Sequence, residues 1–201
     1  YDYVIRFNGG GNAGHTIYLN GEKIVTHLVP CGILHGIHSV IGNGCVINTQ
    51  KLFDELAYLK GLGFDTTLLK IAENAHIITQ DHIDEDSKDT TIGTTRTGNG
   101  PCYKDKVGRT GLRAKDVPEL EPYLVDMYAL IHSSPKKFLA EGAQGYWLDI
   151  DFGDYPYVTS SNTGVGAVLN NGFNYQQIWN VVGVIKCYST YVGAKEYQQI
   201  H

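Results

Sequence analysis

The sequence predicts an α/β protein with a mainly parallel central sheet flanked by helices, and with an added β-hairpin. Short apolar, strand-like runs alternate with amphipathic helical patterns along the 201 residues, as expected when helices connect parallel strands. Glycine occurs 24 times, spread along the chain, which argues against a helical bundle. Hydrophobic residues make up 42% and charged residues 18%, so the chain can bury a core. Its length fits a single domain over residues 1–201.

The first half of the chain contains four predicted elements. In chain order they are a strand at 1–7, a hairpin at 16–30, a buried strand at 39–47 and a helix at about 49–60. Asn20-Gly21 supplies the positive φ angles of a tight hairpin turn. Two glycines interrupt the strand at 39–47, and either Asn48 or Thr49 can cap the helix that follows it.

The second half continues the alternation of strands and helices. It contains one or two strands within 68–79, an acidic run at 81–89 that reads as a solvated helix or loop, a helix at about 118–132, a strand at 137–144 and a final strand at 179–189. We expect the apolar strands among these to form the central sheet, with the helices covering it.

Composition excludes several classes of protein. Lys and Arg total 16 against 21 Asp and Glu, a net charge of −5, so no broad basic field is available to hold a nucleic acid polymer. No apolar run approaches the roughly 20 residues that span a bilayer, so no membrane partner is expected. The four cysteines show no CxxC pairing, which favours a reduced, cytoplasmic setting.

The most informative stretch is "NGGGNAGHT" at 8–16, directly after the first predicted strand. Its three consecutive glycines can bring backbone N–H groups close to a phosphate, and Asn12 and His15 add side-chain donors. Taken alone, this loop is equally compatible with a glycine-rich connection that binds nothing.

Three further stretches accompany this loop. They are "IGTTRTGNGP" at 92–101, "EGAQGYWLDIDFGDYPYVTSSNT" at 141–163 and "CYSTYVGA" at 187–194. Together, and in this order, the four segments resemble the adenylosuccinate synthetase family over about residues 1–194. The resemblance implies GTP-dependent ligation of IMP and L-aspartate to adenylosuccinate, in AMP biosynthesis, through a 6-phosphoryl-IMP intermediate.

The same resemblance implies roles for individual residues. It makes His15 the catalytic residue that contacts the transferring phosphoryl group, and the Gly14 carbonyl a ligand of Mg²⁺. The residues implied to bind IMP are Asn12, Thr95, Arg109, Gln144 and Thr159. In the family the arginine reaches the neighbouring subunit's site, which implies a homodimer. Asp149 and Asp151 look like a metal or acid–base pair, but the family match favours a structural role for them.

The sequence also departs from the family pattern. Arg96 and Thr97 stand where the family commonly has glycine and arginine, and Tyr191 replaces an arginine. The stretch between 113 and 137 is shorter than in many members. The family's N-terminal glycine-rich segment, which holds the general base, and its C-terminal part are expected to lie outside these 201 residues.

Two alternatives to the IMP ligase therefore stay open. One is a homologue that binds a nucleotide without catalysis. The other is a variant ligase that uses a guanine nucleotide as the acceptor, because the residue that would decide this belongs to the N-terminal segment.

Overall fold

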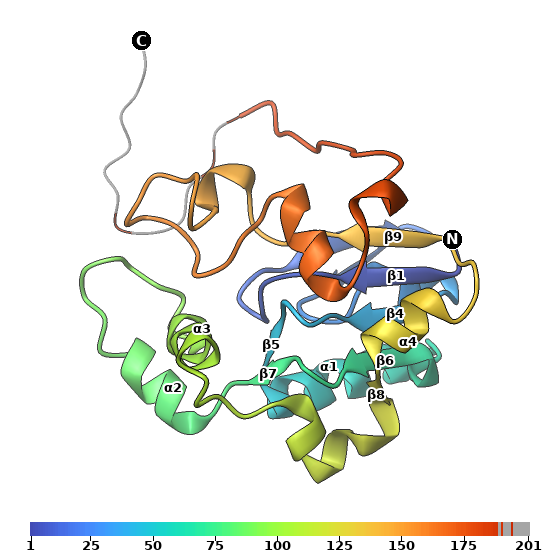
Figure 1. The fold of residues 1–201 in the computed structure, drawn as a ribbon, viewed down its shortest axis with the longest axis horizontal. Helices are drawn as coiled ribbons and strands as arrows, with labels where there is room; N and C mark the ends of the chain where they lie inside the picture. Colours follow the sequence, from blue (N-terminus) through green and yellow to red (C-terminus); the bar gives the residue numbers. More distant parts are fainter. Residues whose placement is uncertain (189, 191–193, 195–201) are drawn as a thin grey trace.

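A computed structural model describes residues 1–188, 190 and 194. Its centre is a five-stranded sheet with the order β8-β6-β4-β1-β9 (Figure 1). The strands are β1 (Tyr3–Arg6), β4 (His38–Ile41), β6 (Leu69–Ala72), β8 (Leu124–Val125) and β9 (Phe138–Glu141). Each neighbouring pair in this sheet is parallel. The predicted fold class is therefore confirmed.

The first strand occupies an inner position of the sheet. Tyr3 lies opposite His38 on one side and Phe138 on the other, so β1 is hydrogen-bonded along both edges. Val4 and Ile5 are 3% and 0% exposed, as expected for a strand of a parallel sheet that is covered on both faces. The carboxyl ends of β1 and β9 consequently lie side by side.

The predicted hairpin is confirmed. It consists of β2 (His15–Leu19) and β3 (Glu22–Thr26), which pair antiparallel. Asn20 and Gly21 connect them with φ angles of 52° and 87°, the positive values that a two-residue hairpin turn requires.

The predicted strand at 39–47 divides into β4 and β5 (Val46–Ile47), which belong to different sheets. The strand is interrupted at its two glycines. At Gly44 the chain passes so close to Phe7 that a Cβ would lie 2.0 Å from the Phe7 carbonyl oxygen, so this position requires glycine. The stretch at 68–79, predicted to hold one or two strands, contains two, β6 and β7 (His76–Ile77). β5 and β7 pair parallel and form a small second sheet.

Four α-helices lie within the described residues. They are α1 (Thr49–Gly61), α2 (Gln80–Asp86), α3 (Asn99–Gly108) and α4 (Met127–His132). Asn48 caps α1 by accepting the Lys51 N–H at 2.9 Å. In Figure 1, α2 and α3 lie beside β5 and β7, on the side toward which the carboxyl ends of β1 and β9 point. The acidic run is thus partly a helix, but its His82 and Asp86 are buried rather than solvated.

Short 3₁₀ segments of three to seven residues lie in the connections between these elements. They are η1 (Cys31–His35), η2 (Thr66–Leu68), η3 (Ala114–Asp116), η4 (Pro118–Tyr123), η5 (Tyr146–Leu148), η6 (Val165–Asn171) and η7 (Tyr175–Gln177). None of the helices in the described ranges has both the length and the apolar character of a membrane span.

The predicted helix at 118–132 is wrong. The chain forms η4, then the edge strand β8, and only then α4. Pro122 lacks an N–H and cannot continue a helix ladder, while Leu124 pairs with Ile71 of β6. Asp126 then starts α4 by accepting the backbone N–H groups of Tyr128 and Ala129.

The predicted final strand at 179–189 is also wrong over its described residues, 179–188. No strand is formed there, and the apolar side chains of Val182 and Ile185 are 84% and 92% exposed. A strand depends on a partner for its backbone hydrogen bonds, and no described strand pairs with this segment. Ser189 and Tyr191 lie outside the described residues.

Candidate functional site

The candidate site lies where β1 and β9 end. The glycine-rich loop at 8–14 follows β1, and the turn at 142–145 follows β9. The Asn8 side chain joins the two loops, since its Nδ2 donates to the Ala143 carbonyl at 3.1 Å and its Oδ1 accepts the Ala143 N–H at 2.9 Å. Both loops are therefore held in a fixed relation, at the sheet edge where open α/β proteins bind ligands.

His15 is paired with a carboxylate of β9. Its Nδ1 lies 2.5 Å from Glu141 Oε1, and the other carboxylate oxygen accepts the Cys31 N–H at 2.8 Å. Burial alone would raise the pKa of the Glu141 carboxyl, but the hydrogen bonds from His15 and Cys31 outweigh it and hold this pKa below its usual value. An ionised Glu141 thus orients the His15 ring and leaves Nε2 free to face a ligand.

Asn12 and Gln144 are also brought together. Gln144 Nε2 donates to Asn12 Oδ1 at 3.1 Å, and Gln144 itself has a positive φ of 64°. Its Oε1 is buried and has no hydrogen-bond partner among the described residues. A glutamine in an unusual backbone conformation, whose buried side-chain oxygen can still accept a hydrogen bond, is suited to recognising a polar ligand.

Helix α3 supports the glycine-rich loop from beneath. The Tyr103 hydroxyl accepts the Gly9 N–H at 3.1 Å and donates to the Gly44 carbonyl at 2.8 Å. A Cβ at Gly10 would lie 2.8 Å from the amide of Asn99. Only glycine permits this close approach of the loop to the first residue of α3.

The buried Arg6 holds the loop from the strand side. Its guanidinium donates to the carbonyls of Asn8 and Gly10 at 3.2 and 3.3 Å. The side chain is fully buried, so a cation is kept directly behind the glycine-rich loop. This positive charge favours an anion on the outer side of the loop.

Thr95 lies on an exposed loop that leads into α3. Its hydroxyl is 2.9 Å from that of Thr97, which in turn donates to Asn99 Oδ1 at 3.4 Å. Asn99 Nδ2 is buried without a partner in the described part of the chain. A chain of polar groups thus connects Thr95 to Asn99, whose amide lies close to Gly10. Arg96, one of the departures from the family pattern, adopts a φ of 55°.

Thr159 is half-buried in a loop that Asp149 organises. The Thr159 N–H donates to the Leu148 carbonyl at 2.8 Å. Asp149 is 1% exposed and accepts backbone N–H groups from Asp151, Thr163 and others. These bonds outweigh the burial that would raise the Asp149 pKa, and they keep it low. Asp149 is therefore a structural residue, as the family match favoured. The Oγ atom of Ser160, the residue after Thr159, lies near Gly100 at the start of α3.

Arg109 stands apart from this group. It ends α3 in the left-handed conformation, with a φ of 65°, and it is exposed. No hydrogen bond or ion pair joins its side chain to another predicted site residue within the described ranges. Gly14 is likewise exposed, one residue before His15 and the start of the hairpin.

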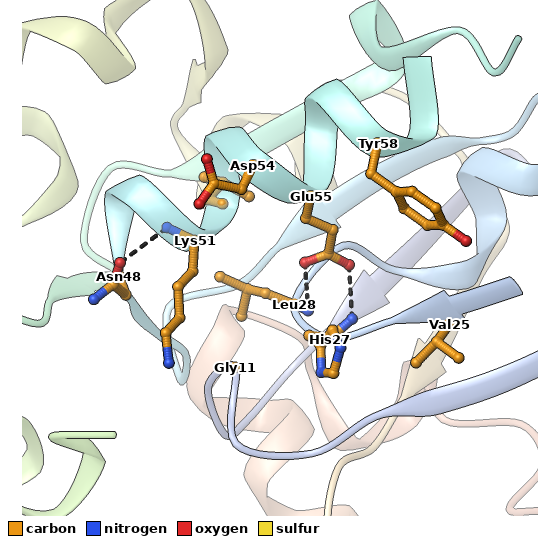
Figure 2. A pocket seen from close by; sticks show the side chains of 10 residues that line it. Gly11, Val25, His27, Leu28, Asn48, Lys51, Asp54, Glu55 and Tyr58 are labelled. Carbon is orange, nitrogen blue, oxygen red and sulfur yellow. Dashed lines mark hydrogen bonds between the residues drawn. The ribbon is translucent and has the colours of Figure 1, made fainter. Parts of the chain in front are cut away.

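A cavity of about 500 Å³ opens between α1, the hairpin and Gly11. Figure 2 shows Glu55 of α1 directed at the chain after β3, where its carboxylate accepts the N–H groups of His27 and Leu28 at 2.7 and 3.0 Å. Lys51 extends from the same helix toward the loop that carries Gly11. The cavity touches the glycine-rich loop, but His15, Asn12 and Gln144 do not line it.

Sequence reasoning missed several residues of this site. Glu141 stood inside the quoted "EGAQG" motif, and its place at the end of a strand could have singled it out. Cys31, Glu55 and Tyr103 carry no local signal, because the partners that give them a role lie 26 or more residues away in the sequence.

A parallel sheet with a glycine-rich loop and convergent polar side chains at its carboxyl edge is typical of α/β proteins that bind a small ligand at that edge. The family model of adenylosuccinate synthetase matches residues 1–121 and 117–198. The chain belongs to the adenylosuccinate synthetase family.

Similar proteins extend this finding. An adenylosuccinate synthetase of Desulfosudis oleivorans is 38% identical, and the match covers 96% of this chain and 58% of that protein. One from Picrophilus torridus is 37% identical, with the same coverage. The chain thus spans less than two thirds of the length of these curated relatives.

Two solved structures share the fold. The fully ligated adenylosuccinate synthetase of Plasmodium falciparum superimposes with a TM-score of 0.85 at 35% identity, covering 98% of this chain and 58% of that one. The succinoaminodeoxyadenylate synthetase of cyanophage S-2L, bound to dGMP and to dATP as an energy donor, gives a TM-score of 0.72 at 27% identity over 87% of this chain and 53% of that one.

Proposed function

We propose that this chain is the IMP-binding portion of a GTP-dependent ligase that joins IMP and L-aspartate to give adenylosuccinate. The observation that carries the proposal is that two pairs of polar side chains are in contact at the carboxyl ends of β1 and β9. Glu141 orients His15 at 2.5 Å, and Gln144 contacts Asn12 at 3.1 Å. Family membership supplies the reaction, and four free cysteines fit a reducing cytoplasmic setting.

Recognition of IMP would divide between its base and its phosphate. The buried free oxygen of Gln144 can accept from the hypoxanthine ring, with Asn12 fixing the amide's orientation. Thr95 and Thr159 lie on loops that flank the start of α3 and would hold the 5′-phosphate through hydroxyl donors. Arg109, exposed at the end of α3, would reach the 5′-phosphate in the neighbouring subunit of a homodimer.

The chemistry has two steps. The γ-phosphoryl group of GTP passes to O6 of IMP as N1 gives its proton to the general base of the family's N-terminal segment, and GDP and 6-phosphoryl-IMP result. The aspartate amine then forms a bond to C6 as the C6–O bond breaks, and inorganic phosphate and an amine proton leave. As the imidazolium, His15 would donate from Nδ1 to Glu141 and from Nε2 to the phosphoryl oxygens, where negative charge must be stabilised in the transition state.

Mg²⁺ fits beside His15. In phosphoryl-transfer sites this ion takes one or two protein oxygens, and substrate phosphates and water complete its octahedron. The exposed Gly14 residue could supply one such oxygen through its backbone carbonyl, directly before His15. When bound with GTP, Mg²⁺ would neutralise charge on the phosphates.

The variant ligase with a guanine acceptor remains the second candidate. Its support is the likeness to the cyanophage protein, whose structure contains dGMP. The higher TM-score and identity to the Plasmodium adenylosuccinate synthetase favour IMP.

Calorimetric titration of the chain with IMP and with dGMP tests these alternatives. We expect IMP to bind more tightly, with Gln144→Ala weakening IMP about tenfold or more through the loss of a buried hydrogen-bond partner. Tighter binding of dGMP would favour the variant ligase, and no binding of either nucleotide would contradict both. Formation of adenylosuccinate from IMP, GTP and aspartate, by a protein that carries this chain together with the family's N-terminal and C-terminal segments, then separates the ligase from a homologue that only binds.

A further inference from the structure

Three metal-ligating side chains of different chemistry converge beside the end of β9. They are the imidazole of His15, the thiol of Cys31 and the carboxylate of Glu141, and one ligand atom from each lies within 4.8 Å of the others. The residues belong to three separate segments: the start of β2, the start of η1 and the end of β9. The fold therefore brings these groups together, since no local motif does.

We propose that His15, Cys31 and Glu141 form a binding site for a thiophilic divalent cation such as Zn²⁺, with water as the fourth ligand. Three protein ligands drawn from His, Cys and a carboxylate, with one open position, are a zinc donor set. Mg²⁺ and Ca²⁺ prefer oxygen ligands throughout. The site is therefore chemically distinct from the Mg²⁺ position proposed at Gly14.

The geometry requires a small rearrangement. His15 Nδ1 and Glu141 Oε1 lie 2.5 Å apart in a hydrogen bond, whereas two ligands on tetrahedral zinc are separated by about 3.4 Å. The pair must open by about 0.9 Å, with the cation replacing the shared proton. Glu141 stays tethered through its second oxygen, which accepts the Cys31 N–H. The side chains of His15 and Glu141 are 23% and 15% exposed, so a cation and its water can enter.

The charges around the site favour a thiophilic metal. The thiolate is the form of Cys31 that ligates a metal, so a cation that binds there displaces the thiol proton to solvent. Arg6 is the neighbouring charge that opposes a cation. This opposition favours a metal that gains strongly from a thiolate bond over one that gains only from charge.

Metal binding would change the state of His15. His15 Nδ1 cannot keep its hydrogen bond to Glu141 while both side chains ligate the cation. Inhibition by Zn²⁺ would follow, and this consequence rests on the proposed function. The binding site itself does not, so it can be tested without any nucleotide.

Titration of the metal-free chain with Co²⁺ tests the site. Cobalt bound to a thiolate gives a charge-transfer absorption band, and we expect one equivalent to bind and to be displaced by Zn²⁺. Cys31→Ser should abolish the band and weaken Co²⁺ binding at least about 100-fold. The loss of a residue that only supports a metal ligand already weakens binding by up to about 100-fold, and Cys31 would be a ligand itself. Cys187→Ser, which alters an exposed cysteine outside the cluster, is the matched control and should bind as the wild type does.

A second measurement keeps the test independent of folding defects in the variants. In the wild-type chain, Zn²⁺ should slow alkylation of Cys31, read by peptide mass spectrometry, while the rate at Cys187 stays unchanged. A cobalt complex without a thiolate band, a band that persists in Cys31→Ser, or equal alkylation of Cys31 with and without Zn²⁺ would overturn the proposal.

Discussion

Glu141 is the residue on which the contacts of the candidate site converge. One carboxylate oxygen binds the imidazole of His15, and the other accepts a backbone N–H from the segment that follows the hairpin. Two segments distant in sequence are thereby fixed to the end of β9. The charge of Glu141 should therefore contribute to stability as well as to the orientation of His15.

The pH dependence of stability tests this charge. The folded-state pKa of Glu141 lies below the ordinary value of 4.5, so its ionised form stabilises the fold above that pH, and the contribution is lost as the pH falls through the folded pKa. We expect Glu141→Gln to lower the free energy of unfolding at about pH 7, and we expect the difference from wild type to shrink as the pH falls below 4.5. Urea denaturation at several pH values measures the difference.

Glu22→Gln is the matched control, because Glu22 is an exposed carboxyl on β3. It should leave stability nearly unchanged at every pH. A loss in Glu141→Gln that persists undiminished in acid would show that shape, and not charge, accounts for its effect.

The glycine-rich loop allows an equally direct comparison. A Cβ at Gly10 would lie 2.8 Å from the Asn99 amide and 2.9 Å from the Val46 carbonyl oxygen, whereas a Cβ at Gly11 meets nothing within 4 Å. We expect Gly10→Ala to cost about 1–3 kcal/mol through overpacking, and Gly11→Ala to cost less than about 0.5 kcal/mol. Thermal or chemical denaturation of both variants provides the measurement, and equal losses would contradict the close approach to Asn99.

At the scale of elements, α1 and the hairpin are joined through one buried side chain. The Glu55 carboxylate accepts the N–H groups of His27, Leu28 and Val29 at 2.7, 3.0 and 3.3 Å. These N–H groups belong to the segment that follows β3. Among the described strands, β3 itself pairs with β2 alone. Glu55 therefore sets the position of the hairpin over the cavity that reaches Gly11.

Substitution of Glu55 should loosen this connection. Glu55→Ala leaves three N–H groups without their acceptor, and we expect a loss of at least about 2 kcal/mol of stability. Hydrogen exchange should accelerate at residues 27–29 before it does in β1. Asp54→Ala is the control on the same helix, because Asp54 is exposed and, among the described residues, accepts a hydrogen bond from Gln50 and not from the chain after β3. Unchanged exchange at 27–29 in Glu55→Ala would refute the anchoring role.

At the scale of the whole molecule, the position of Arg109 bears on assembly. The residue is exposed at the end of α3, away from the group around His15 and Gln144. In the role that the family resemblance implies, this guanidinium would contact the nucleotide phosphate of a second subunit.

The concentration dependence of nucleotide binding tests the homodimer. We expect Arg109→Ala to weaken IMP binding about tenfold or more where sedimentation shows a dimer, and to have little effect where dilution yields monomer. Lys104→Ala, an exposed cation on the same helix paired with Glu85, should leave binding unchanged in both. An equal loss in monomer and dimer would exclude a cross-subunit contact.

Local patterns were sufficient for much of this molecule. The parallel strands, the Asn20-Gly21 hairpin, the Asn48 cap and the glycine-rich loop were all predictable, because periodicity, turn residues and caps act over a few neighbouring positions. The four motifs also identified the family, since they preserve residue types in a particular order. The two wrong elements show where such patterns fail.

Contacts between distant segments settled the rest. Residues 124–125 form a strand because they pair with β6, whereas residues 179–188 pair with no described strand and form none. Glu141 meets His15 and Cys31 only when β9 lies beside β1. Hydrogen bonds and packing require groups to meet in space, and a separation of 126 residues along the chain leaves no local trace of such a meeting.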